Sequence, residues 1–263
     1  MTLELVDVSK TYRVPGTGRV AAVDGVSVRL EPGRTLALVG QSGSGKSTIA
    51  KMLTLLERPT SGRLLLDGER PRSRGRGARA YRGRVQMVFQ DPFASLNPYH
   101  SVGHHLERPL RIHRRVPAAD VHARVIELLE RVRLTPGDTF AARRPHELSG
   151  GQRQRVAIAR ALAAEPDYLV ADEPVSMLDV SIRLGVLNLI ADVQRQEGLG
   201  MLYITHDLAT ARHFSDEIAV MHQGRIVEQG PADDVILDPQ HEYTRRLRDA
   251  SPDPARHFAG GAA

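Results

Sequence analysis

The residues best suited to chemistry form a glycine-rich octapeptide, Gly40–Ser47, with the sequence GQSGSGKS. It matches the pattern G-x-x-x-x-G-K-[S/T], in which backbone amides surround phosphates while the lysine reaches the β- and γ-phosphates and the hydroxyl reaches Mg²⁺. The apolar run Thr35–Val39 predicts a strand before it, and Thr48–Leu53 predicts a helix after it, a context that a chance glycine-rich turn would lack. We therefore expect a phosphate site made by Gly40, Ser42, Gly43, Ser44, Gly45, Lys46, Ser47 and Thr48.

Two adjacent carboxylates follow a second apolar run. Tyr168–Ala171 predicts a buried strand that leads directly into Asp172 and Glu173. Asp172 would hold Mg²⁺ through its water shell, and Glu173 would orient or deprotonate the water that attacks the γ-phosphate. An isolated Asp-Glu pair is usually a solvated loop, but the strand before it and the phosphate loop upstream favour a catalytic pair.

Three other side chains lie where they could complete the site. Gln90 follows the predicted strand Val85–Phe89 and could join the Mg²⁺ and water shell, and His206 follows Met201–Thr205 and could contact the γ-phosphate. Tyr12, in a short turn-rich segment, could stack on an adenine ring. The alternatives are a surface or core histidine and a partly buried strand aromatic.

A second glycine motif, Leu148–Gln152 with the sequence LSGGQ, precedes a predicted helix over 152–164. Ser149 occupies an N-cap-like position, Gly150 and Gly151 permit close backbone approach, and the helix N-terminus favours an anion. One nucleotide needs only one phosphate loop. The second motif therefore indicates a nucleotide that is shared with another chain.

These motifs in this order resemble the ATP-binding subunit of an ABC transporter, over about residues 1–245. The resemblance implies an α/β fold: a P-loop NTPase with a RecA-like core, a small antiparallel β subdomain and an inserted helical subdomain. It implies ATP and Mg²⁺ as cofactors, and two subunits that close head to tail over two ATP molecules. Each ATP would lie between one phosphate loop and the opposite LSGGQ motif.

The resemblance also implies a role for each motif. The catalytic residues would be Glu173, His206 and Gln90. The Mg²⁺ site would use Ser47, Gln90 and Asp172. Beyond the phosphate loop, the nucleotide would be contacted by Tyr12, Asp172, Ser149, Gly150, Gly151, Gln152 and Asp179.

Two segments carry a narrower resemblance to importers of dipeptides, oligopeptides and nickel. Phe89–Pro98 is similar to the long loop after the conserved glutamine in that group, and His241–Leu247 is similar to its His-Pro-Tyr-Thr stretch, with Glu242 in place of proline. This implies uptake of peptides or nickel-type chelates, and a groove at about Phe93–Tyr99 for a cytoplasmic helix of the two permease subunits. It further implies an extracytoplasmic solute-binding protein that acts indirectly and a position at the cytoplasmic side of the membrane. The second ATPase would be a related but distinct chain, with a homodimer as the alternative.

Other functions fit less well. Soluble ABC ATPases that act on nucleic acid or ribosomes usually carry two ATPase domains or a long coiled-coil insertion, and 263 residues hold neither. Fused exporters carry membrane helices in the same chain, and P-loop kinases lack LSGGQ. The cargo is not encoded here, because its contacts lie on other subunits.

Composition sets further bounds. The chain has a formal net charge of +5 and no cysteine, which removes disulfides and thiolate metal sites. No run approaches the ~20 apolar residues needed to cross a bilayer, so we expect membrane contact only through partners. Seven arginines lie in Arg70–Arg84, where we expect a solvated loop rather than contact with lipid headgroups or an acidic partner, and no nucleic-acid partner is expected.

Hydrophobic periodicity predicts the remaining organisation. Half-buried strands are expected at 3–8, 26–30 and 64–66, amphipathic helices at 121–132 and from 182 to Gly198, and a hairpin that turns at Gln223-Gly224. We expect one ABC ATPase domain over 1–250, composed of a β layer and core (1–90), a helical insertion (91–160), core (161–230), a C-terminal segment (231–250), and then a disordered tail (251–263).

Overall fold

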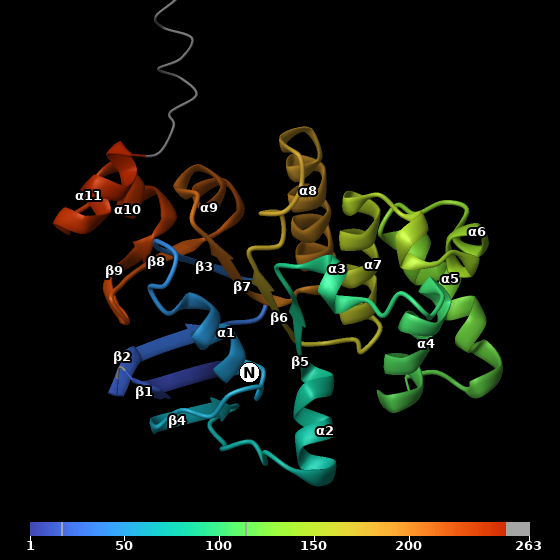
Figure 1. Cartoon of the computed structure of the whole chain (residues 1–263), viewed down its shortest axis with the longest axis horizontal. Helices are drawn as coiled ribbons and strands as arrows, with labels where there is room; N and C mark the ends of the chain where they lie inside the picture. The colour runs from blue at the N-terminus through green and yellow to red at the C-terminus, as the bar shows by residue number, and fades with distance from the viewer. Residues whose placement is uncertain (17, 114, 251–263) are drawn as a thin grey trace, which may run out of the picture.

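The computed structural model describes residues 1–16, 18–113 and 115–250, so the expected tail at 251–263 lies outside the described residues. Two sheets organise the described chain, one with three strands and one with six. Figure 1 shows the helices of the middle of the chain gathered on one side of the larger sheet and the small sheet on the other. The predicted α/β class with a separate β layer and a helical insertion is confirmed.

The small sheet is antiparallel with the order β2-β1-β4 and comprises β1 (Leu3–Val14), β2 (Gly18–Leu30) and β4 (Ser61–Leu66). Alternate side chains such as Leu3 and Leu5 are buried, as the period-two pattern predicted. The first two strands are longer than expected. Tyr12 therefore lies in β1, paired with Val20, and the prediction of a turn-rich segment there was wrong.

The large sheet has the order β5-β6-β7-β3-β8-β9, and its first five strands run parallel. They are β3 (Thr35–Val39), β5 (Val85–Val88), β6 (Tyr168–Asp172), β7 (Gly200–Thr205) and β8 (Glu217–His222), with β9 (Arg225–Pro231) antiparallel at the edge. Continuous apolar runs become parallel strands because helices cover both faces. At the β8–β9 hairpin, Gln223 and Gly224 both have positive φ, the backbone that a two-residue hairpin turn requires.

The helix α1 (Lys46–Leu53) packs between the two sheets, where Ile49, Met52 and Leu53 are fully buried. The helical insertion and the helices of the second half of the chain complete the core. They are α3 (Pro92–Ser95), α4 (Val102–His113), η1 (Ala118–Asp120), α5 (Val121–Arg131), α6 (Gly137–Ala142), η2 (Pro145–Glu147), α7 (Gly150–Leu162), α8 (Val180–Glu197), α9 (Leu208–Phe214), α10 (Ala232–Leu237) and α11 (Glu242–Asp249).

The arginine-rich segment departs from expectation, because α2 (Gly75–Arg84) is a helix rather than a solvated loop. Tyr81 is buried on it and donates its hydroxyl hydrogen bond to the Leu53 carbonyl. Arg84 pairs with Asp67 at 2.9 Å and also with Asp167. These contacts hold α2 against the rest of the fold and explain the order that composition alone did not predict. Among the described helices, none has the length and apolarity that a membrane crossing demands.

Candidate functional site

The phosphate loop joins β3, at the centre of the large sheet, to α1. Its two outer fixed glycines are required by close backbone approach. A Cβ at Gly40 would lie 2.2 Å from the Met221 carbonyl oxygen, and one at Gly45 would lie 2.3 Å from the Ala22 carbonyl oxygen. Gly45 also has φ of 111°, a left-handed backbone that side chains disfavour. The loop is therefore fixed in shape by strands of both sheets.

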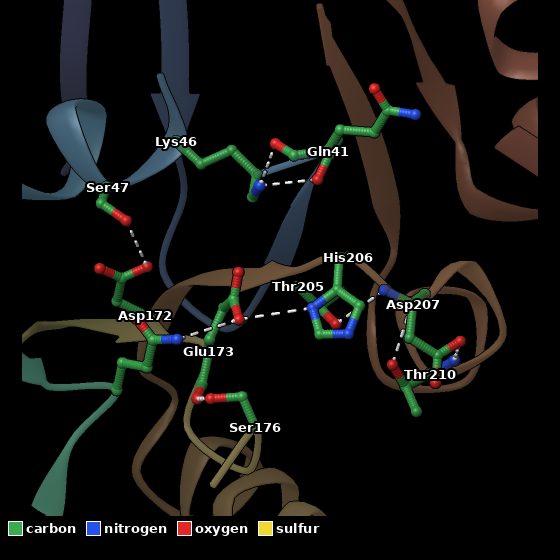
Figure 2. Close-up of polar contacts among 12 residues, drawn as sticks. Gln41, Lys46, Ser47, Asp172, Glu173, Ser176, Thr205, His206, Asp207 and Thr210 are labelled. Atoms are coloured by element: carbon green, nitrogen blue, oxygen red, sulfur yellow. Dashed lines mark hydrogen bonds and ion pairs between the residues drawn. The ribbon is translucent and has the colours of Figure 1, made fainter. Parts of the chain in front are cut away.

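Lys46 is buried at the base of this loop. Its Nζ donates to the Gly40 carbonyl at 2.6 Å and to the Gln41 carbonyl at 2.9 Å, as Figure 2 shows for Gln41. Burial lowers the pKa of Lys46, and the nearby negative charges of Glu173 and Asp172 oppose that shift. Ser44 Oγ is also buried and has no hydrogen-bond partner among the described residues. The Lys46 ammonium group and the Ser44 hydroxyl, both within the loop, are therefore suited to bind an anion such as a phosphate.

Asp172 ends β6 directly below α1. Its Oδ1 accepts a hydrogen bond from Ser47 Oγ at 3.2 Å, and the carboxyl group is buried. Burial raises the pKa of Asp172, Glu173 raises it further, and the Ser47 hydrogen bond acts in the opposite direction. A hydroxyl and a carboxylate at this spacing form an oxygen donor set of the kind that Mg²⁺ uses.

Glu173 is the meeting point of three strand ends (Figure 2). Its Oε2 lies 3.4 Å from Gln90 Nε2, which follows β5, and 3.4 Å from His206 Nδ1, which follows β7. Glu173 has φ of 43°, so the chain turns sharply as it leaves β6. Because β5, β6 and β7 are parallel neighbours, their carboxyl ends bring these side chains to one edge of the sheet.

A cavity of about 650 Å³ opens at this edge. Its lining includes half of the predicted site residues, namely Ser42, Gly43, Gly45, Lys46, Ser47, Thr48, Gln90, Glu173 and His206. The lining also includes three residues that were not predicted: Ala22, Gln41 and Leu247. Gln41 occupies a variable position of the phosphate-loop pattern, and no sequence motif indicates a nucleotide contact for Ala22 on β2 or Leu247 on α11. Tyr12 does not line it, and its ring instead lies 5.0 Å from Lys10 Nζ.

The LSGGQ motif lies away from this cavity, at the start of α7. Ser149 caps that helix reciprocally with Gln152: Gln152 N donates to Ser149 Oγ at 3.3 Å, and Ser149 N donates to Gln152 Oε1 at 3.0 Å. A Cβ at Gly151 would lie 2.7 Å from Ile182 Cγ2, so the close packing of α7 against α8 also favours glycine there. Asp179, at the N-terminus of α8, is also outside the cavity lining. The structure thus separates LSGGQ and Asp179 from the predicted residues that line the cavity.

Comparison with known proteins gives consistent results. A family model described as ABC transporter matches residues 23–176, more than half of the chain. The dipeptide transport ATP-binding protein DppF of Haemophilus influenzae is 47% identical over 235 residues, which cover 89% of this chain and 71% of that protein. The glutathione import ATP-binding protein GsiA of Escherichia coli is 49% identical over 243 residues, 91% of this chain but 39% of that protein.

A solved structure agrees with these relatives. The ATP-binding cassette MJ0796, described as a dimer in a post-hydrolysis state with ADP and Pi, superposes with a TM-score of 0.77 at 30% identity. The match covers 88% of this chain and 98% of the other. The cavity at the sheet edge, the matched family model and these relatives lead to one conclusion: the chain belongs to the ABC transporter family and is one of its ATP-binding, ATP-hydrolysing subunits.

Proposed function

We propose that ATP binds with Mg²⁺ in the cavity above α1, and that Ser47, Gln90 and Asp172 hold the ion directly or through water. When bound, Mg²⁺ supplies positive charge to the phosphate oxygens. Glu173 Oε2 is the base that accepts a proton from the attacking water. Gln90 and His206 hold this carboxylate from two sides, and the loop amides with Lys46 bind the phosphates. The oxygen donors at Ser47 and Asp172 support this assignment, and so does the Ser44 hydroxyl, which has no partner within the described part of the chain.

Lys46→Ala is expected to weaken ATP binding about 10- to 100-fold, the loss typical of a charge-assisted hydrogen bond. Titration of the chain with a fluorescent ATP analogue measures it. Arg63→Ala is the control, since it also removes one positive charge, Arg63 is exposed on β4, and the variant should bind as wild type. Unchanged affinity in Lys46→Ala would reject the site.

We propose that the transport function is ATP-driven import of peptides. The observation that carries this proposal is the similarity to DppF and GsiA, whose names describe dipeptide transport and glutathione import. The chain would act at the cytoplasmic side of the membrane as a peripheral subunit. A nickel-type chelate is the alternative cargo. In either case, an extracytoplasmic solute-binding protein would deliver the cargo to the permease subunits.

The permease subunits would dock in a groove beside Phe93–Tyr99. A groove of about 1160 Å³ lies there between the core and α4, and Gln90 and Ser47 line both this groove and the nucleotide cavity. Its lining is rich in basic side chains and imidazoles, including Arg82, His100, His104, His105, Arg108 and Arg160. The His100 and His104 rings stack with centroids 4.1 Å apart. Charge complementarity therefore favours a permease segment that carries acidic side chains.

The ATPase partner would be a second, related chain. LSGGQ does not line the cavity of its own chain, so each nucleotide site would be completed by the LSGGQ motif of the other subunit. We propose a heterodimer, as in the importer group that this chain resembles, with slow hydrolysis by the chain alone.

Co-expression with candidate permeases and ATPases, followed by mass determination of the intact complex and a dipeptide uptake assay, tests both proposals. We expect one copy of this chain, one related ATPase and two permease subunits. Two copies of this chain in an active complex would reject the heterodimer, and uptake of no peptide would reject the cargo.

A pair of variants tests the groove in the same experiment. Ala94→Glu adds bulk and negative charge to the groove lining and should reduce co-purification of the permeases. Ala123→Glu makes the same change at an exposed position on α5, outside the groove, and should not.

A further inference from the structure

The C-terminal helix α11 returns to the phosphate loop. Tyr243 lies in its first turn, and its hydroxyl oxygen accepts a hydrogen bond from the backbone N–H of Gln41 at 3.2 Å. The two residues are separated by 202 positions in the sequence. Gln41 is the second residue of the phosphate loop, so a side chain near the end of the described chain contacts the loop directly.

The Tyr243 ring is held in place from several directions. It stacks on His222, at the end of β8, with ring centroids 3.9 Å apart and an interplanar angle of 28°. The carboxylate of Glu228 on β9 accepts hydrogen bonds from Gln240 N at 2.7 Å and His241 N at 3.1 Å, which ties the start of α11 to the sheet. His241 Nδ1 then accepts from Tyr243 N at 3.1 Å. The position of the Tyr243 hydroxyl is therefore fixed, because contacts with β8 and β9 hold the start of α11.

Both backbone groups of Gln41, the N–H and the carbonyl, form hydrogen bonds with side chains. Its N–H donates to Tyr243, and its carbonyl accepts from Lys46 Nζ at 2.9 Å (Figure 2). The Lys46 contact must change when the ammonium group turns to a phosphate, whereas the Tyr243 contact can persist. The Tyr243 hydroxyl would then hold the first half of the loop in place while Lys46 exchanges its backbone carbonyl partners for a phosphate.

The same helix also reaches the cavity itself. Leu247, one turn after Tyr243, is part of the cavity lining together with Gln41 and Ser42. A second, smaller cavity of about 360 Å³ separates the rest of α11 from the loop and is lined by Gln41, His222, Tyr243 and Leu247. The helix α11 thus reaches the nucleotide site twice, by the hydrogen bond from the loop backbone to Tyr243 and by Leu247 in the cavity lining.

We propose that Tyr243 is a positioning residue of the ATP site: through its hydrogen bond to Gln41 it pre-orders the phosphate loop, so that α11 sets the affinity for ATP. The inference rests on the assignment of Gly40–Ser47 as the nucleotide site. Pre-ordering raises affinity because the loop loses less conformational freedom when the phosphates bind. It should not change the chemical step, since the hydrogen bonds and ring contact found for Tyr243 among the described residues involve Gln41, His241 and His222, and not Gln90, Glu173 or His206.

The test is Tyr243→Phe in the full chain, which retains the ring stacked on His222 and removes only the hydroxyl. We expect the Kd for a fluorescent ATP analogue and the KM for ATP to rise about fivefold, the factor typical of one lost hydrogen bond. We expect kcat at saturating ATP to stay within about twofold of wild type. Hydrogen exchange of the peptide that contains Gln41 should accelerate, a readout that general destabilisation alone would not confine to this loop.

Tyr168→Phe is the matched control. It deletes the hydroxyl of a buried tyrosine on β6 that has no hydrogen-bond partner among the described residues, and it should leave Kd, KM and loop exchange unchanged. Equal affinities of Tyr243→Phe and wild type would overturn the inference, and so would tighter binding. If Lys46→Ala loses ATP while Tyr243→Phe binds normally, only the role of Tyr243 fails. If Lys46→Ala also binds normally, the nucleotide site itself is rejected.

Discussion

Replacing Glu173 with glutamine is expected to lower ATP turnover about 10²- to 10⁴-fold, the cost of losing a general base. The amide retains the size of the carboxylate and can still lie near Gln90 and His206, which are each 3.4 Å from Oε2 in the native site. It cannot accept a proton from water. ATP binding depends on the phosphate loop and should remain within about twofold of wild type, so the variant should accumulate as an ATP-bound closed pair. Steady-state turnover, nucleotide titration and size determination with ATP measure these three effects.

Glu127→Gln provides the matched control for this variant. Glu127 is on α5, its side chain is 61% exposed, and it does not line the nucleotide cavity. Its turnover should equal that of wild type. Turnover near wild type in Glu173→Gln would remove Glu173 from the role of base and leave Asp172 as the remaining carboxylate at this strand end.

Replacing Ser149 with arginine is expected to abolish hydrolysis by the assembled pair and to spare ATP binding by the separate chain. Ser149 is exposed at the N-terminus of α7 and outside the cavity of its own subunit. A bulky side chain there would occupy the space that the partner's phosphates need, while the variant's own phosphate loop is untouched. Comparison of monomer affinity with turnover of the assembled ATPase pair separates the two effects.

The control for this variant must account for the lost helix cap, which costs ~1 kcal/mol of stability. Ser149→Ala removes the same hydroxyl cap without adding bulk. It should lower the melting temperature as Ser149→Arg does and retain much more of the turnover. If Ser149→Arg instead weakens ATP binding by the monomer, the site would be complete within one chain, and the shared-site proposal would be wrong.

The central strands and their ends could be predicted because the pattern that identifies each strand lies within one short segment of the sequence. Apolar runs such as Thr35–Val39 and Tyr168–Ala171 have no polar face, so they must be buried between helices, and their parallel pairing brings Gln90, Glu173 and His206 to one edge. The phosphate loop could be predicted because its pattern requires glycine at positions 40 and 45, where a Cβ would collide with the backbone of another strand. The catalytic and metal roles of these residues stay predictions until the variants are measured.

Other features depend on contacts between distant segments, which sequence patterns do not encode. The order of α2 comes from Tyr81, which packs in the core, and from Arg84, which pairs with Asp67 and Asp167, whereas composition alone indicated a solvated loop. The contact of α11 with the phosphate loop joins positions 41 and 243, although the importer-like stretch that includes Tyr243 was recognisable. Gly151 shows a third case, in which a glycine interpreted as serving a phosphate also allows close packing against Ile182.

The nucleotide cavity and the proposed permease groove share side chains, since Gln90 and Ser47 line both. Both side chains therefore face the two compartments at once. A shift of the Gln90 side chain toward one compartment would withdraw it from the other. With a permease segment in the groove, this one side chain would couple nucleotide and membrane subunit without a relay of intermediate residues. Substitutions that change the size of Gln90 should accordingly alter ATP turnover and permease docking together, whereas changes deeper in either compartment should alter only one.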